Sequence, residues 1–220
     1  MFSKKITVLF FSVLLGGNLL AITNIVLDGK SGSVNVSFEI GDITKLVFQD
    51  PKHAAIVNAA KPSLLGGGGV DGAIHKAAGP GLLAECQKIK QVSLGVRCPT
   101  GEARITGGHN LGSVKIIHTA GPDIRPKLVP NDDEKKLLGN CYRNVLDVAE
   151  QNKITQVAFV SISTGIFGYP LKEAVSVAAQ VICDYFKDNE SLLKTVRFIF
   201  LDQDTLDVYA QAFSRVIKSI

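Results

Sequence analysis

The sequence has no tryptophan and only 7% aromatic residues, so aliphatic side chains must supply most of its core. It also lacks the charge excess of disordered chains, because 20% of its residues are charged and 46% are hydrophobic. Most of the chain is therefore expected to fold. Its 220 residues suit one ordinary domain, long enough to bury a core without disulfides or metals.

The sequence also lacks a large excess of positive or negative charge. The formal net charge is +4, and two of the lysines, Lys4 and Lys5, lie in the first few residues. The rest of the chain is close to neutral and has no basic stripe, which argues against DNA and other nucleic acids as partners. The mild positive bias is compatible with a small anionic ligand.

Cysteine motifs are absent too. None of the four cysteines (Cys86, Cys98, Cys141 and Cys183) forms a Cys-x-x-Cys pair or a cluster with zinc-ligand spacing. We interpret them as isolated small apolar residues and expect no metal site. Their even number leaves disulfides open if the protein is exported.

Residues 1–21 have the order of a secretory signal. A short basic head precedes an apolar run over 6–15, and Ala21 suits the position before a cleavage site. The run is shorter than the roughly 20 residues that cross a membrane. We predict a signal peptide over 1–21, a secreted or periplasmic protein, and one folded domain over 22–220. The alternatives are an uncleaved membrane anchor and a cytoplasmic protein whose start is misassigned.

Strands alternate with helices along the rest of the sequence. Strand patterns occupy 34–40, 54–58, 114–119, 157–161 and 195–201. Helical patterns occupy 70–78, 171–186, 204–217 and a stretch over 137–148 that Asp132 or Asp133 would cap. This alternation predicts an α/β fold with a mixed, largely parallel sheet that helices cover on both faces.

The loop after the strand at 54–58 carries four consecutive glycines, Gly66–Gly69. Ligands of such sheets bind outside the carboxyl ends of the strands, so this loop is a candidate site. Glycine lets backbone N–H groups approach phosphate oxygens, and a helix N-terminus favours negative charge. The loop has neither the P-loop ending nor the Rossmann glycine spacing. A flexible surface turn is the alternative interpretation.

A second loop, Ser161–Pro170, also follows a buried strand and precedes a helix. Ser163, Thr164 and the backbone of Gly165–Gly168 can donate to phosphate oxygens, so the two loops together would hold a diphosphate from both sides. Phe167 is suited to packing against a sugar. A role as an apolar anchor of the loop is the alternative for this ring.

Asp42 follows the strand at 34–40, in the sequence Gly-Asp-Ile-Thr. From these residues alone we favour a helix cap at Asp42, with the helix beginning at Ile43. The alternative is a carboxylate that accepts a hydrogen bond from the exocyclic amine of a bound ligand.

Together these segments resemble the macro domain family. The motifs that carry the resemblance occur in the family's order and are Gly41–Thr44, Ile56–Ala60, Leu64–His75, Cys98–Thr106, Ile117–Pro122 and Ser161–Pro170. The resemblance covers about 22–218 and implies a three-layer α/β/α macro-domain sandwich. The GGGGVDG and STGIFGYP loops are most similar to MacroD-type members, which remove mono-ADP-ribose from acidic side chains and deacetylate O-acetyl-ADP-ribose.

The resemblance implies a role for each loop in binding ADP-ribose. Asp42 would bind the adenine amine and Ile43 would add a backbone contact. Asn58 and Phe167 would border the distal ribose, and Asp71 would be the catalytic carboxylate. The diphosphate would be held by Gly67, Gly68, Gly69, Val70, Ser163, Thr164, Gly165, Ile166 and Phe167. One helical turn beyond Asp71, His75 is interpreted as a structural histidine.

The sequence departs from the family at Lys61, where the family pattern has a second asparagine beside the distal ribose. Pro62 follows and favours an extended Lys61. Three placements remain open: the amine in solvent, a charged donor to the ribose or Asp71, and a covalent or general-base site. Lys61 therefore joins Asp71 and Asn58 as a candidate catalytic residue.

The leading hypothesis is an ADP-ribosyl hydrolase that acts on ADP-ribosylated protein or on O-acetyl-ADP-ribose, with Asp71 orienting water. The alternative is a non-catalytic ADP-ribose reader, because Lys61 replaces the family's asparagine. A weaker third hypothesis, a poly-ADP-ribose or single-stranded RNA binder, is disfavoured by the near-neutral charge. We expect a monomer that needs no cofactor.

Overall fold

The computed structural model describes residues 7–15 and 18–219, and this part of the chain forms one eight-stranded sheet. The strands are β1 (Thr7–Leu15), β2 (Asn18–Gly29), β3 (Gly32–Ile40), β4 (Ala54–Ala60), β5 (Ala103–Thr106), β6 (Lys115–Ala120), β7 (Gln156–Phe159) and β8 (Thr195–Phe200). Their order across the sheet is β1-β2-β3-β8-β7-β4-β6-β5. All five strands expected from the sequence are therefore present.

The centre of the sheet is parallel and its edges are antiparallel. Strands β3, β8, β7, β4 and β6 run in the same direction, whereas β1, β2 and β5 pair antiparallel with their neighbours. The predicted mixed, largely parallel sheet is confirmed. Parallel strands end at one edge of a sheet, so the loops that follow them gather there.

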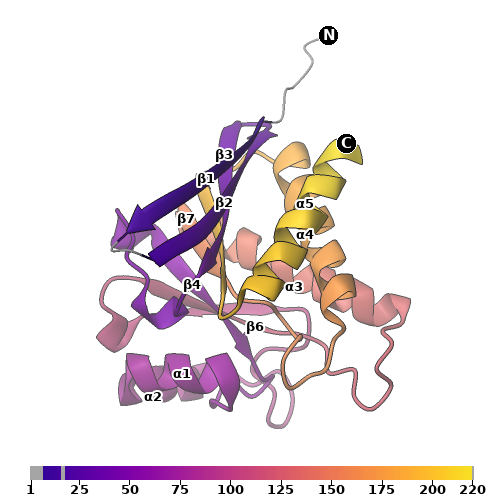
Figure 1. The fold of residues 1–220 in the computed structure, drawn as a ribbon. Coiled ribbons are helices and arrows are strands. Elements are labelled where there is room, and N and C mark those ends of the chain that lie inside the picture. The colour runs from indigo at the N-terminus through magenta and orange to yellow at the C-terminus, as the bar shows by residue number, and fades with distance from the viewer. Residues whose placement is uncertain (1–6, 16–17, 220) are drawn as a thin grey trace.

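Helices cover both faces of the sheet and complete the predicted three-layer sandwich. They are α1 (Gly69–Ala78), α2 (Pro80–Lys88), α3 (Asp132–Gln151), α4 (Leu171–Asp188) and α5 (Gln203–Ser219). Figure 1 shows α1 and α2 on one side of the sheet and α3, α4 and α5 on the other. None of the helices in the described residues is long and apolar enough to cross a membrane.

Alternation along the central strands builds a separate core on each face. In β4, Ala55 and Val57 join the cluster under α3, α4 and α5, whereas Ala54 and Ile56 join the cluster under α1. Successive side chains of a strand point to opposite faces, so a doubly covered strand must be apolar throughout. The run at 54–58 meets this condition up to Asn58, the first polar residue of the strand.

Three elements differ from the sequence expectations. The N-cap of α3 is Asn131, whose side chain accepts from the Glu134 N–H while Glu134 bonds back to the Asn131 N–H. The expected cap at Asp132 or Asp133 is therefore wrong by one or two residues, because a complete capping box favours Asn131. The short elements α2 and β5 lie where no element was expected.

Part of the predicted signal segment lies within the sheet. Of residues 1–21, the structure describes 7–15 as β1 and 18–21 as the beginning of β2. The two strands pair antiparallel from Thr7 with Val26 to Leu15 with Asn18. Cleavage and export remain predictions, since strand pairing in the full chain does not report what a signal peptidase does.

The few aromatic residues concentrate in the core under α5. The ring of Phe198 lies within 5.7 Å, centroid to centroid, of four others: Phe38, Phe159, Tyr209 and Phe213. Aromatic pairs at such spacings add to the stabilisation that burial provides. Phe198 therefore joins β3, β7 and α5 around the middle of the sheet.

We predict that Phe198→Ala lowers the free energy of unfolding by about 3–5 kcal/mol, because it removes a buried ring and leaves a cavity. Phe198→Leu should cost clearly less, since leucine refills much of the volume. Urea unfolding followed by far-UV circular dichroism measures both. Equal losses for the two variants would show that the contacts of the aromatic ring, and not the buried volume, carry the contribution of Phe198.

Candidate functional site

A cavity of about 720 Å³ opens at the edge of the sheet where the parallel strands end. Its wall comes from the residues that follow β3, β4, β6, β7 and β8, together with the first turn of α1. The two glycine-bearing loops singled out in the sequence therefore face one cavity, as the strand-end rule implies.

Most of the candidate residues named from the sequence line this cavity. They are Asp42, Ile43, Lys61, Gly68, Gly69, Val70, Asp71, Ser163, Thr164, Gly165, Ile166 and Phe167. Two do not: Gly67, within the glycine loop, is not part of the wall, and Asn58 is fully buried and contacts Asp71. Asn58 therefore contacts the wall residue Asp71 but does not itself line the cavity.

The sequence reasoning missed the end of the cavity beyond β8. Leu201, Asp202 and Thr205 line it there, and Gly121 lines it after β6. Asp202 also caps the last helix, since its Oδ1 accepts from the Thr205 N–H at 2.8 Å. The sequence predicts the strand at 195–201, and ligands of such sheets bind at the loops that follow the strands. The loop after this strand could therefore have been predicted as part of the site.

Asp42 is a helix cap that also faces the cavity. Its Oδ1 accepts from the N–H of Thr44 at 2.9 Å and from the Thr44 hydroxyl at 2.7 Å, which confirms the expected cap before the short helix Ile43–Lys45. The hydrogen bond from the Thr44 hydroxyl, followed by that from its N–H, lowers the pKa of Asp42. The carboxylate is therefore charged near neutral pH, and its Oδ2 forms an ion pair with Lys45, whose Nζ lies 3.6 Å away.

The glycine loop brings the backbone close to the carboxylate of Asp71. A Cβ at Gly67 would lie 2.9 Å from Asp71 Oδ2 and 3.1 Å from Lys61 Cε, closer than real side chains allow. The loop leads into α1, whose N-cap Gly68 has no side chain to bond the first N–H groups. Those N–H groups and the helix dipole favour an anion at this end of the cavity.

The loop after β7 forms the facing wall. Ser163 adopts φ +65°, and its carbonyl accepts from the Tyr169 N–H at 3.0 Å, which closes the loop. Its buried hydroxyl has no hydrogen-bond partner among the described residues. A Cβ at Gly121 would collide with this hydroxyl, so glycine is required where the two loops meet. Arg125 lies over the ring of Phe167, with its guanidinium carbon 6.0 Å from the ring centroid.

Asp71 is buried, and its two carboxylate oxygens differ. Oδ1 accepts from the amide of Asn58 at 2.8 Å and lies 3.5 Å from His75 Nε2. Oδ2 is buried without a hydrogen-bond partner in the described part of the chain, although Asp71 lines the cavity. One oxygen is thus anchored to the protein, and the other is left to interact with whatever occupies the cavity.

Lys61 shares the cavity wall with Asp71. The place that a Cβ at Gly67 would take is 3.4 Å from Lys61 Nζ and 2.9 Å from Asp71 Oδ2, so the amine and the carboxylate approach the same point. Within residues 18–219 they do not form an ion pair. Lys61 is exposed and lines the cavity, and the three placements considered from the sequence stay open.

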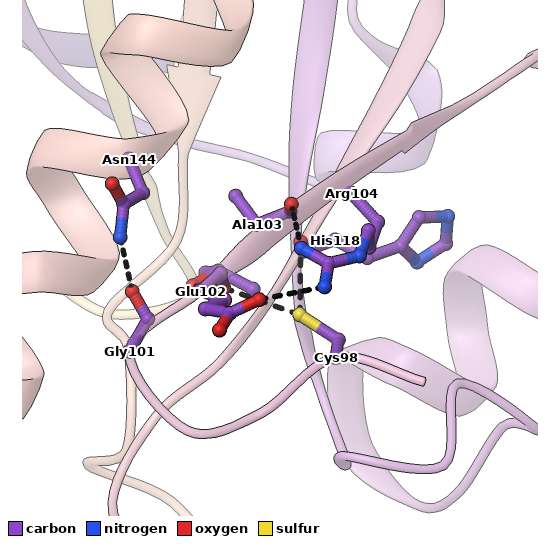
Figure 2. Close-up of polar contacts among 8 residues, drawn as sticks. Cys98, Gly101, Glu102, Ala103, Arg104, His118 and Asn144 are labelled. Carbon is purple, nitrogen blue, oxygen red and sulfur yellow. Dashed lines mark hydrogen bonds and ion pairs between the residues drawn. The ribbon is translucent and has the colours of Figure 1, made fainter. Parts of the chain in front are cut away.

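Beneath the floor, Asn58 contacts His118, whose Nδ1 lies 3.0 Å from the same amide nitrogen. Burial, followed by the nearby His75, lowers the pKa of His118 to about 3, so its ring is neutral. Figure 2 shows the ring of His118 pointing away from the contacts between Cys98 and Glu102. Those contacts fix the loop before β5, where Cys98 Sγ lies 3.2 Å from the Glu102 carbonyl.

The cysteines behave as small apolar residues, as expected. All four are unpaired and buried within the described chain, and burial raises the pKa of the Cys86 thiol to about 11. In the same residues, no group of three or more histidines, cysteines or acidic residues is arranged to hold a metal ion. The polar groups that line the cavity are carboxylates, an amine, hydroxyls and backbone groups.

Comparison with known proteins places this geometry in a family. The Macro domain family model matches residues 57–178. A macro domain-containing protein of Xanthomonas axonopodis pv. citri is 45% identical over 174 residues, which cover 79% of this chain and 92% of that protein. The ADP-ribose glycohydrolase MACROD2 of Xenopus laevis is 46% identical over 170 residues, but these span only 38% of its length and 77% of this chain.

Solved structures give the same result. The Oceanobacillus iheyensis macrodomain with ADP matches with a TM-score of 0.77 and 38% identity, covering 90% of this chain and 99% of that one. The Trypanosoma brucei macrodomain in complex with ADP-ribose matches with a TM-score of 0.67 and 34% identity, covering 80% and 68%. The fold, the cavity and these relatives agree, and the chain belongs to the macro domain family.

Proposed function

We propose that the cavity binds ADP-ribose and that the protein hydrolyses mono-ADP-ribose from acidic side chains or the ester of O-acetyl-ADP-ribose. The observation that carries this proposal is the state of Asp71. Its Oδ1 is held by Asn58, Oδ2 has no hydrogen-bond partner in the described residues, and the residue lines the cavity beside the glycine loop. A fixed carboxylate with a free oxygen can orient a water molecule and accept its proton.

The relatives support the ligand and the reaction. The Oceanobacillus iheyensis and Trypanosoma brucei macrodomains were solved with ADP and with ADP-ribose, and MACROD2 is an ADP-ribose glycohydrolase. The matched region spans only part of MACROD2, so the hydrolytic activity of this chain is inferred from its own cavity. An opening of about 720 Å³ is in the range of ligand pockets.

Each part of the cavity would then hold one part of the ligand. Asp42 accepts a hydrogen bond from the adenine amine, and Phe167 packs on the distal ribose. The N–H groups at the start of α1 and the loop from Ser163 hold the diphosphate from two sides. Water attacks C1″, the bond from C1″ to the acidic side chain breaks, and the carboxylate leaves as Asp71 takes the proton of the water. Much of the rate would come from this positioning.

Asp42 should make the cavity selective for adenine. Replacing adenine by hypoxanthine in the ligand exchanges an amine donor for a carbonyl, so affinity should fall by about tenfold or more, the value of one charge-assisted hydrogen bond. Asp42→Ser keeps an oxygen for the cap but cannot reach the base, and it should bind both nucleotides equally. Isothermal titration calorimetry measures all four affinities. Retained discrimination in Asp42→Ser would remove Asp42 from the adenine site.

Asp71→Asn should lower the turnover of a mono-ADP-ribosylated protein by at least about 100-fold, as expected for loss of a general base. ADP-ribose binding should persist, because the amide keeps an oxygen for the Asn58 N–H and preserves the shape of the wall. Released ADP-ribose is quantified by chromatography. If the native chain binds ADP-ribose tightly but releases none, the hydrolase proposal fails and the non-catalytic reader is the correct function.

Lys61 should contribute its charge to ligand binding. Lys61→Met keeps most of the side-chain length but removes the charge, so ADP-ribose affinity should fall by about tenfold at low salt. The difference between native and variant should shrink at high salt, where a partly exposed charge is screened. Calorimetry in low and high sodium chloride tests this. An unchanged affinity would place the amine in solvent, and a higher turnover of Lys61→Asn would favour the reader.

A further inference from the structure

Four polar side chains form a continuous chain beneath the cavity floor. They come from four elements: Thr106 on β5, His118 on β6, Asn58 on β4 and Asp71 on α1. All four are buried, with side chains or residues no more than 5% exposed. The Thr106 hydroxyl lies 2.9 Å from His118 Nε2, His118 Nδ1 lies 3.0 Å from Asn58 Nδ2, and Asn58 Nδ2 lies 2.8 Å from Asp71 Oδ1.

The hydrogen positions in this chain follow from its ends. The amide nitrogen of Asn58 carries two hydrogens, and one of them is donated to Asp71 Oδ1. The second can only go to His118 Nδ1, which must therefore accept. A neutral histidine that accepts at Nδ1 carries its proton on Nε2, and this proton is donated to the Thr106 hydroxyl.

A flipped Asn58 amide and a charged His118 ring are both excluded, because each would bring two like hydrogen-bonding groups together. Turning the Asn58 amide over would set its oxygen against the Asp71 carboxylate, two acceptors at hydrogen-bonding distance. A charged His118 would set an N–H against the Asn58 N–H. Two titratable groups near the ring do not favour a charge on it: the Cys86 sulfur lies 4.0 Å from Nε2, and the ring of His75 lies 6.4 Å away, centroid to centroid. Burial also keeps the ring neutral.

We propose that His118 is a positioning residue for the reaction of Asp71: with Thr106 it fixes the Asn58 amide, which holds Oδ1 and leaves Oδ2 without a partner among the described residues. This inference rests on the proposed hydrolase function but concerns residues that never touch the ligand. His118 has no access to solvent and is not among the residues that line the cavity. Its effect on turnover passes through Asn58.

The first test reads the proton directly and needs no activity. In the native chain labelled with ¹⁵N-histidine, two-bond nitrogen–proton correlations should show His118 with Nε2 protonated and Nδ1 bare. The pattern should persist between pH 5 and 8, where an ordinary histidine titrates. Thr106→Val removes the acceptor of Nε2–H and should shift that resonance. A protonated Nδ1, or a charged ring in this range, overturns the proposal.

The second test compares two variants of nearly equal shape. His118→Asn places a carbonyl oxygen near the position of Nδ1 and can still accept from Asn58. His118→Leu has the same branching but no acceptor, so Asn58 loses its anchor. We expect turnover to be lower in His118→Leu than in His118→Asn by a factor on the order of 100, with equal KM and equal ADP-ribose affinity.

Leucine is larger than asparagine and apolar, so the stability of both variants is measured by urea unfolding, and turnover is compared at a temperature where both are folded. Equal turnover in the two variants overturns the positioning role. If both variants unfold, Thr106→Val is the replacement, with a drop in kcat at constant affinity expected and an unchanged kcat contradicting the proposal. Absence of turnover in the native chain would overturn the hydrolase function alone, because the nitrogen spectra still decide the state of His118.

Discussion

The parallel pairing of β4 with β6 is the constraint on which the site depends. Its register sets Asn58 opposite His118 and Ala60 opposite Ala120, so both strands end together at the cavity. A shift of β4 by one residue would turn Asn58 to the opposite face of the sheet, away from His118, and its polar group would enter an apolar core. The apolar residues before them, packed between helices on both faces, make such a shift costly. The core thereby fixes the place of the polar residues under the floor.

Strands, loops and most of the cavity wall could be predicted from the sequence, because each depends on a local pattern. Apolar runs marked the strands, and the glycines marked the close approaches of the backbone. The cap of α3 was misplaced because Asn131, Asp132 and Asp133 are all good capping residues, and only the reciprocal bond of Glu134 decides among them. Single-residue choices of this kind are made by geometry that a linear pattern does not contain.

The burial of Asn58 shows a second limit of the sequence. The resemblance implies that Asn58 borders the distal ribose, whereas the structure buries its side chain completely and leaves it out of the cavity wall. Only the sheet register, together with α1 above it, shows that both of its N–H groups are used inside the protein. The partner His118 lies 60 positions away in the chain, in a motif that carries no catalytic signal of its own. Contacts across a sheet are not visible in local periodicity.

The cavity draws its wall from residues as distant as Gly41 and Thr205. The last helix must therefore be docked before a ligand can be fully enclosed, since its cap residue Asp202 forms part of the wall. A ligand that binds only when the last helix is docked stabilises the docked state, and this stabilisation grows with the logarithm of the ligand concentration. Ligand binding and docking of α5 are thus linked equilibria. A nucleotide bound at the sheet edge would protect the whole of this helix, including the end that lies far from the cavity.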